Sequence, residues 1–225
     1  MSPARDEPAR SSRDVVIVGC GGHGREIFEI IRVINAADPA GPRWRVVGFV
    51  DDKPSAAHRE LVGRLGSTYL GPVEWLAELG PDTRVVLGVG DPRVRRAVAA
   101  RVDEYGLRYA SLIHPAATVG SDLVAGEGTV LFAGARVTTN VVLGRHVHLN
   151  QNVTVGHDCE IGNFVSVHPL AAVSGNCHLA DGALVGAGAV VLPGLRVGAD
   201  ATVGAAACVV RDVPAGVVVK GVPAR

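Results

Sequence analysis

The chain has 225 residues, which is enough for one large domain or two of modest size. Its 22 basic side chains balance its 22 acidic ones, so no net field draws the protein to nucleic acid or to an anionic membrane surface, and we expect neither as a partner. No apolar run approaches the ~20 residues that a membrane-spanning helix requires.

Residues 1–13 combine charges, prolines and serines without an apolar centre. This composition predicts a disordered tail and argues against a signal peptide, so we expect a cytoplasmic protein. The four cysteines are expected to remain thiols in that compartment.

A glycine-rich turn follows the first predicted strand. Residues 14–19 form a short apolar run typical of a buried parallel strand, and residues 25–34 carry isoleucines at helical spacing. Between them lies the sequence GCGGHG, from Gly19 to Gly24. In this strand–turn–helix context the glycines let the backbone approach an anion, and the helix N-terminus offers free N–H groups to it. A tight turn without a ligand is the alternative interpretation.

Further strand signals complete an α/β unit. A second predicted strand, residues 45–50, ends in Asp51 and Asp52, whose carboxylates are placed to accept hydrogen bonds from ribose or sugar hydroxyls. A third, residues 84–88, leads to Gly90 and then to a helix start, which is marked by Asp at the N-cap and Pro at the first helical position.

With a fourth predicted strand at residues 107–113, residues 14–112 form a Rossmann-like βαβ domain of three or four parallel strands. This is shorter than a complete dinucleotide-binding domain, so a nucleotide-linked small molecule fits the glycine turn better than NAD does.

The remainder, residues 113–225, is dominated by a period of six residues. Every sixth position from Val119 to Val209 is aliphatic, and small residues prevail four places further on. This hexapeptide repeat predicts an all-β domain, a parallel β-helix in which three hexads make one coil. Residues 18 apart then stack about 4.8 Å from each other in successive coils. The sixteen aliphatic positions are Val119, Ala125, Leu131, Val137, Leu143, Leu149, Val155, Ile161, Val167, Val173, Leu179, Val185, Val191, Val197, Val203 and Val209.

One histidine of the repeat has the surroundings of a general base. His157 and Asp158 fall on a turn and face outward, and the residues one coil before and after His157 are the small Thr139 and Gly175. An adjacent carboxylate raises the basicity of an imidazole and fixes its tautomer. The N–H of Gly175 is placed to stabilise a developing oxyanion.

The other histidines of the repeat are expected on the surface or at interfaces, with His148 and His168 as candidates to line a cleft between subunits. No metal site is expected, because the spacings scatter the rings over different turns. These four residues are His146, His148, His168 and His178.

Five motifs together resemble the NeuD/PglD family of bacterial sugar acetyltransferases, and the resemblance covers residues 14–225. They are GCGGHG at 19–24, FVDD at 49–52, LIHP at 112–115, VGHDC at 155–159 and KGVP at 220–223.

The resemblance implies a left-handed β-helix, a homotrimer, and an acetyl-CoA site between two β-helices. It implies that His157 is the catalytic base and that Asp158 increases its basicity. Positions expected to hold a nucleotide-linked amino sugar are Gly21, Gly22, His23, Asp51, Asp52, Gly90 and Arg95. Positions expected to contact acetyl-CoA are Ser166, Ala187 and Ala205.

Three functions are compatible with these features. The first is acetyl-CoA-dependent N-acetylation of a nucleotide-linked 4-amino-deoxy sugar, by direct attack of the amine and without a metal. The second is O-acetylation of a sugar such as sialic acid. The third is a non-catalytic trimeric scaffold that binds nucleotide sugars, and the pair of His157 and Asp158 argues against it.

Overall fold

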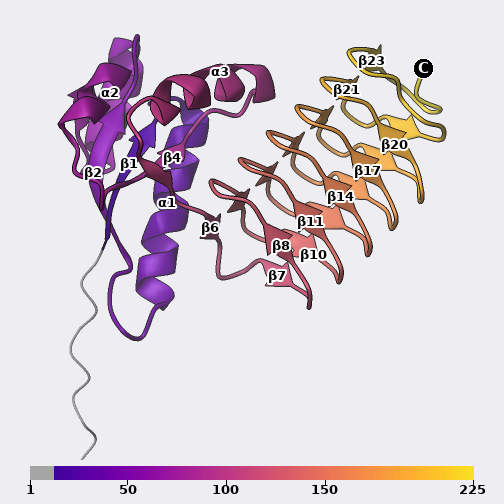
Figure 1. Ribbon diagram of the computed structural model, residues 1–225, viewed down its shortest axis with the longest axis horizontal. Helices are drawn as coiled ribbons and strands as arrows, with labels where there is room; N and C mark the ends of the chain where they lie inside the picture. Colours follow the sequence, from indigo (N-terminus) through magenta and orange to yellow (C-terminus); the bar gives the residue numbers. More distant parts are fainter. Residues whose placement is uncertain (1–12) are drawn as a thin grey trace, which may run out of the picture.

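The computed structural model describes residues 13–225. Figure 1 shows an α/β unit at one end and an elongated β-helix that carries the C-terminus at its far end. The predicted tail lies outside the described residues except for Arg13, which begins the first strand. Within residues 13–225, no helix is both long enough and apolar enough to cross a membrane.

The α/β unit contains one parallel sheet with the strand order β3-β2-β1-β4-β5. This confirms the Rossmann-like class, but the sheet has five strands where three or four were predicted, because the sequence pattern did not predict the short strand β3. Helix α2 was not predicted either. The strands are β1 Arg13–Val18, β2 Trp44–Val50, β3 Tyr69–Gly71, β4 Arg84–Leu87 and β5 Arg108–Tyr109. The helices are α1 Gly22–Ala37, α2 Ala56–Arg64, the 3-10 helix η1 Val73–Glu78 and α3 Pro92–Asp103.

Apolar burial and one cap explain these elements. Ile17 of β1 and Ile27 and Ile31 of α1 have no exposed surface, and each such side chain contributes roughly 1.5–3 kcal/mol on burial. Helix α3 begins as predicted, because the Asp91 carboxylate accepts hydrogen bonds from the N–H groups of Arg93 and Val94.

The predicted fourth strand at residues 107–113 is wrong as a single element. The N–H of Ala110 donates to Val85 in the α/β sheet, whereas the N–H of Leu112 donates to Thr129 in the β-helix. The chain therefore leaves one sheet and enters another within three residues, and an apolar run alone does not reveal such a change of partner.

Three parallel sheets of two-residue strands form the β-helix, as the six-residue period predicted. Sheet I contains β6 Leu112–Ile113, β9 Val130–Leu131, β12 His148–Leu149, β15 Ser166–Val167, β18 Leu184–Val185, β21 Thr202–Val203 and β23 Val218–Val219. Sheet II contains β7 Thr118–Val119, β10 Arg136–Val137, β13 Thr154–Val155, β16 Ala172–Val173, β19 Val190–Val191 and β22 Cys208–Val209. Sheet III contains β8 Val124–Ala125, β11 Val142–Leu143, β14 Glu160–Ile161, β17 His178–Leu179 and β20 Arg196–Val197.

The predicted aliphatic positions fill the prism. From Leu131 to Val209 each of them is at most 3% exposed, whereas Val119 in the first coil is 39% exposed because nothing stacks on that end. Pairing joins residues 18 apart from β6 to β22, as between His148 and Ser166. The last pair, β21 with β23, joins Thr202 to Val218, which are 16 apart.

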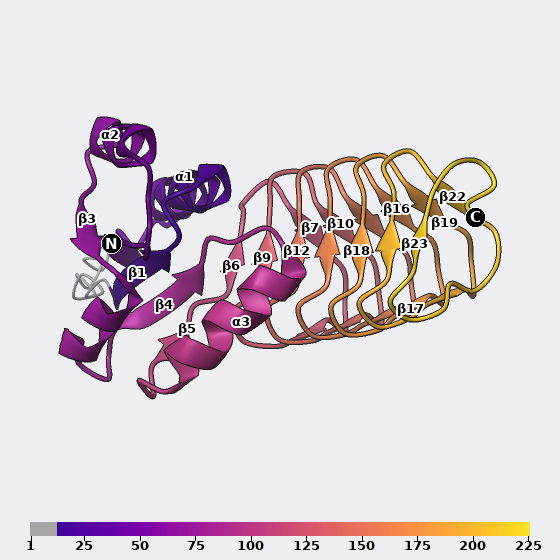
Figure 2. The same cartoon turned by 90° about the horizontal axis from the view of Figure 1, so that it is seen from above.

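The α/β unit packs on sheet I and on the corner between sheets III and I. Figure 2 shows α3 lying along the side of the β-helix. Arg96 of α3 lies 3.1 Å from the carboxylate of Asp200 on that corner, and Arg145 of the β-helix lies 3.4 Å from Asp103 at the end of α3. The corner between sheets II and III is consequently on the side away from the α/β unit.

Candidate active site

The predicted catalytic pair lies on the turn between β13 and β14, at the corner of sheets II and III. Nδ1 of His157 is 2.6 Å from Oδ2 of Asp158, and the side chain of Asn140 donates to the other carboxylate oxygen at 3.0 Å. The hydrogen bond from His157 and then that from Asn140 lower the pKa of Asp158. The carboxylate therefore stays ionised and holds the ring through Nδ1.

This arrangement leaves Nε2 of His157 free beside Gly175. The His157 side chain is 58% exposed, and a Cβ built on Gly175 would lie 2.6 Å from Nε2. Only a residue without a side chain allows the ring to rest against the next coil. Within the described part of the chain, the N–H of Gly175 donates to no protein acceptor.

The expected nucleotide-sugar positions surround the carboxyl ends of β1 and β4, where the strand order of the sheet reverses direction. In α/β sheets ligands bind in the crevice at this point. A Cβ on Gly24 would lie 1.9 Å from the carbonyl oxygen of Gly19, so these two glycines serve the tight packing of the turn. A Cβ on Gly21 would meet nothing within 4 Å, and one on Gly22 only the tip of Arg25. Gly21 and Gly22 are therefore the members of the turn that a ligand can approach.

The carboxylates of Asp51 and Asp52 border the same crevice and are already hydrogen-bonded. Asp51 accepts from the N–H of Cys20 at 2.8 Å and from that of Lys53 at 3.0 Å, which fixes the glycine turn to the end of β2. Asp52 is paired with Arg101, whose hydrogen bond lowers the pKa of the carboxyl. In this structure the two carboxylates hold the loops around the crevice in place, Asp51 through the glycine turn and Asp52 through Arg101 of α3.

His23 of the glycine turn contacts the β-helix directly. Its Nε2 lies 2.8 Å from Nδ1 of His148, and the two rings stack with centroids 5.0 Å apart. His148 is 1% exposed, and burial lowers its pKa well below the ordinary value. On its other side, Nδ1 of His23 is 3.6 Å from Glu26, and a Cβ on Gly90 would lie 3.7 Å from the His23 ring.

Two expected ligand contacts are revised by burial. Arg95 has no exposed surface, and its side chain donates to carbonyl oxygens on both sides of the junction, including Gly90 at 2.9 Å and Phe164 at 2.9 Å. Burial lowers its pKa to about 9. Ser166 is 1% exposed and donates to Gly90 at 2.9 Å. Both residues join the two parts of the chain, and both side chains are engaged by protein groups.

Ala187 and Ala205 are exposed on turns that follow strands of sheet I, at the corner between sheets I and II. They are successive members of one column, since the N–H of Ala206 donates to the carbonyl of Ala187. In a single chain the predicted groups are therefore far from one another around the prism. The sugar loops lie against sheet I, Ala187 and Ala205 lie at the corner of sheets I and II, and His157 lies at the corner of sheets II and III.

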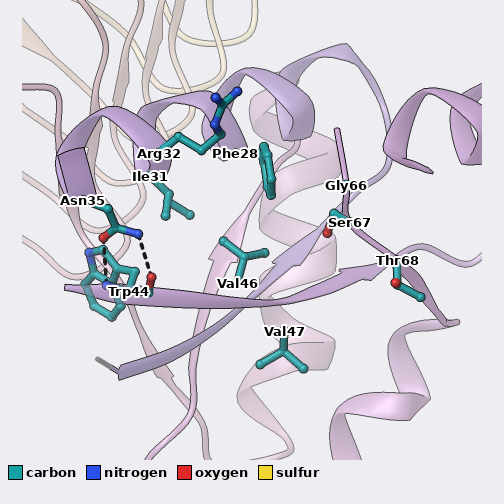
Figure 3. A pocket seen from close by; sticks show the side chains of 10 residues that line it. All are labelled: Phe28, Ile31, Arg32, Asn35, Trp44, Val46, Val47, Gly66, Ser67 and Thr68. Carbon is teal, nitrogen blue, oxygen red and sulfur yellow. Dashed lines mark hydrogen bonds between the residues drawn. The ribbon is translucent and has the colours of Figure 1, made fainter. Parts of the chain in front are cut away.

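The described part of the α/β unit carries surface pockets. One of about 280 Å³ lies between α1, the start of β2 and the loop before β3 (Figure 3), where the side chain of Asn35 binds the backbone of Trp44 at 2.7 and 2.9 Å. None of the predicted site residues lines it. Another of about 420 Å³ is lined by Gly22, Arg25 and Arg64 among others.

Sequence reasoning missed Asn140 and was wrong about His146 and His148, which were expected on the surface or at interfaces but are 0% and 1% exposed, because the α/β unit covers them. Asn140 stands 18 residues before Asp158, so the repeat period itself was the signal that could have linked them. The partnership of His148 with His23 spans 125 residues and carries no local signal. Among residues 13–225, no group of three or more His, Cys, Asp or Glu residues is arranged to hold a metal ion.

Comparisons with known proteins agree with this architecture. Residues 14–102 match the PglD N-terminal domain. The chain is 36% identical over 124 residues to UDP-N-acetylbacillosamine N-acetyltransferase of Bacillus subtilis (strain 168), a match that covers 54% of the chain and 52% of that relative. It therefore spans about half the length of the curated relative.

Solved structures match over nearly the whole chain. The acetyltransferase domain of PglB from Neisseria gonorrhoeae FA1090, in complex with acetyl coenzyme A, is 31% identical with a TM-score of 0.83 and covers 96% of this chain and 99% of its own. PerB from Caulobacter crescentus, in complex with CoA and GDP-perosamine, is 31% identical with a TM-score of 0.84, covering 94% and 96%. The chain belongs to this PglD family of sugar N-acetyltransferases, in which a PglD N-terminal domain precedes a hexapeptide-repeat β-helix.

Proposed function

We propose that the protein is an acetyl-CoA-dependent N-acetyltransferase that acts on a nucleotide-linked 4-amino-deoxy sugar. The observation that carries the proposal is the imidazole of His157, held through Nδ1 by Asp158 with Nε2 free beside Gly175. The relatives support the choice of substrates, since one is an N-acetyltransferase by name and another was solved with CoA and GDP-perosamine.

The proposed chemistry is a direct transfer. The sugar amine attacks the carbonyl carbon of the thioester, a C–N bond forms, and Nε2 of His157 removes the proton that the nitrogen loses. The oxyanion that develops is within the reach of the Gly175 N–H. The C–S bond then breaks, the sulfur takes up a proton, and CoA leaves as the free thiol. No covalent enzyme intermediate is needed.

We further propose that the site is shared between copies of the chain in a homotrimer. His157 and the α/β unit of the same chain occupy opposite sides of the prism, because the II/III corner faces away from sheet I. A neighbouring chain can bring its glycine turn, with Gly21 and Gly22, to that corner. Acetyl-CoA would then lie between two β-helices and meet the exposed backbone at Ala187 and Ala205.

The test is release of free thiol from acetyl-CoA in the presence of UDP- and GDP-linked 4-amino-6-deoxy sugars. We expect release that depends on one amino sugar and is lost in His157→Ala. His178→Ala is the matched control, because His178 is another partly exposed repeat histidine with a carboxylate partner, Glu160 at 3.2 Å. Loss of activity in the control, or transfer that survives in His157→Ala, would contradict the proposed role of His157.

Nitrogen specificity requires its own comparison. Each amino sugar that supports thiol release is compared with the same nucleotide sugar carrying a hydroxyl at C4. An amine is the better nucleophile towards a thioester, so we expect the hydroxyl compound to be inert. Equal rates would support O-acetylation, and binding without any thiol release across the panel would support a non-catalytic scaffold.

A further inference from the structure

Two neighbouring side chains of sheet I hold the two loops that surround the crevice of the α/β unit. His148 is hydrogen-bonded to His23 of the glycine turn at 2.8 Å, and Ser166 donates to the carbonyl of Gly90 at 2.9 Å. His148 and Ser166 are paired one coil apart on β12 and β15. The glycine turn follows β1 and Gly90 follows β4, so a side chain of sheet I is bonded to each of the two loops.

We propose that His148 and Ser166 are positioning residues for the nucleotide-sugar site: by fixing His23 and Gly90 on the β-helix, they set the spacing of the two loops that receive the substrate. The inference rests on the proposed function, since it assigns a role within the sugar site and not within the acetyl-CoA site. Neither residue is expected to touch the sugar.

Burial makes the attachment of His23 specific. His148 is 1% exposed, so water does not compete for its Nδ1, and the ring of His23 also lies 5.1 Å from that of Phe132. With Nε2 engaged by His148, the other nitrogen of His23 faces Glu26 at 3.6 Å, and hydrogen bonding to His23 lowers the pKa of Glu26. The contact therefore determines which edge of the His23 ring borders the crevice.

The attachment of Gly90 is doubled, which allows it to be weakened without unfolding the junction. The Ser166 hydroxyl accepts from Arg95 at 3.0 Å while it donates to Gly90. Arg95 donates independently to Gly90 and to Phe164, each at 2.9 Å. Removing the hydroxyl thus leaves the guanidinium with other acceptors, whereas the Gly90 carbonyl loses one of its two hydrogen bonds.

The experiment measures KM for the nucleotide sugar and for acetyl-CoA, together with the sugar Kd by calorimetry, in Ser166→Ala, His148→Leu and His148→Asn. Loss of one hydrogen bond weakens an interaction by roughly threefold to tenfold. We expect Ser166→Ala and His148→Leu to raise the KM and Kd for the sugar by that factor, with the KM for acetyl-CoA unchanged. His148→Asn should recover most of the loss, because an amide can place a polar atom near the position of Nδ1.

Thr202→Ala is the control for loss of a hydroxyl, because Thr202 lies two coils beyond Ser166 in the same column of sheet I. The proposal is overturned if Ser166→Ala and His148→Leu keep the wild-type KM and Kd for the sugar, or if KM rises equally for both substrates, which would indicate general loosening. A wild-type protein that neither binds nor acetylates any sugar of the panel would overturn the proposed function itself. A wild-type protein that is active, with variants that match it, would overturn only the positioning role.

Discussion

The imidazole of His157 rests against the backbone of Gly175 in the next coil, so closely that a Cβ at Gly175 would lie 2.6 Å from Nε2. The two residues are 18 positions apart, one full coil. The ring orientation that exposes Nε2 therefore depends on a missing side chain as much as on the carboxylate of Asp158.

Gly175→Ala should lower activity without unfolding the protein. The new methyl group would push the ring away from Asp158, and a displacement of about 1 Å at a catalytic group can cost roughly 10²-fold in rate. We expect kcat to fall by that order, with Tm close to the wild type. Gly63→Ala is the matched control, because a Cβ at Gly63 would meet nothing within 4 Å. An unchanged kcat in Gly175→Ala would show that the close packing of His157 on Gly175 does not contribute to catalysis.

Asp158→Asn should reduce kcat more than Asn140→Ala does. The carboxylate orients the His157 ring and stabilises its protonated form, so its loss should cost on the order of 10²-fold. Asn140 contributes a single hydrogen bond to that carboxylate at 3.0 Å, so its removal should cost only about fivefold. Steady-state kinetics at saturating concentrations of both substrates separates the two cases, and the reverse order would contradict the arrangement.

Acid should destabilise the junction through His146. The His146 residue is 0% exposed. Its ring lies edge-on to that of Tyr109, with the centroids 4.3 Å apart, and stacks on that of Phe164, with the centroids 4.9 Å apart. Burial first, and then the charge of Arg145, lower its pKa from 6.5 to about 4. The unfolded chain takes up this proton below pH 6.5 while the folded chain resists it, so stability is complete above pH 6.5 and falls as the pH drops towards 4.

The cost is at most about 1.4 kcal/mol for each pH unit in that window. Urea unfolding at pH 7 and pH 5 measures it. His146→Phe should have a weaker pH dependence, because phenylalanine has no group to titrate. The position should tolerate the ring, since Phe164, one coil further, has a φ of 58° and His146 one of 56°. An identical pH dependence in the variant would assign the acid sensitivity to other groups.

Arg95 should be essential for the joining of the two parts. Its guanidinium donates to Val89 and Gly90 on one side and to Phe164 on the other, at 2.9 Å each. Arg95→Leu removes the side-chain donor from the carbonyls of Val89 and Phe164, each at a cost of roughly 1–3 kcal/mol, so Tm should fall by many degrees. The Tm of Arg95→Lys should lie between those of the wild type and Arg95→Leu, because an ammonium group cannot reach the acceptors on both sides at once. Thermal unfolding that matches the wild type in Arg95→Leu would contradict this role.

A shared site predicts complementation between two inactive variants. His157→Ala lacks the base, and Gly21→Phe fills the open space before the glycine turn, where a Cβ meets nothing within 4 Å. Mixed oligomers obtained by co-expression should regain roughly a quarter of the wild-type activity, because random assortment pairs an intact turn with an intact His157 that often. If every chain contains a complete site, the mixture stays inactive.

The sequence determined the features that depend on local periodicity. The six-residue period placed the β-helix strands from β7 to β22, because each of these hexads repeats the same packing of one aliphatic residue inside the prism. It also placed His157 and Gly175 in one column, since residues one period of 18 apart stack directly. The glycine turn after β1 and the N-cap at Asp91 were equally local, as both depend on backbone groups within a few residues.

The tertiary structure decided which polar residues meet across the two parts. Arg95 and Ser166 looked like ligand contacts, yet docking of α3 on the β-helix buries both, and burial obliges their polar atoms to bind the nearest carbonyls. His23 and His148 are 125 residues apart, so only the packing of α1 on sheet I brings them to 2.8 Å. The side of the prism that carries the α/β unit was likewise undetermined by the repeat, because three nearly equivalent faces satisfy the same period.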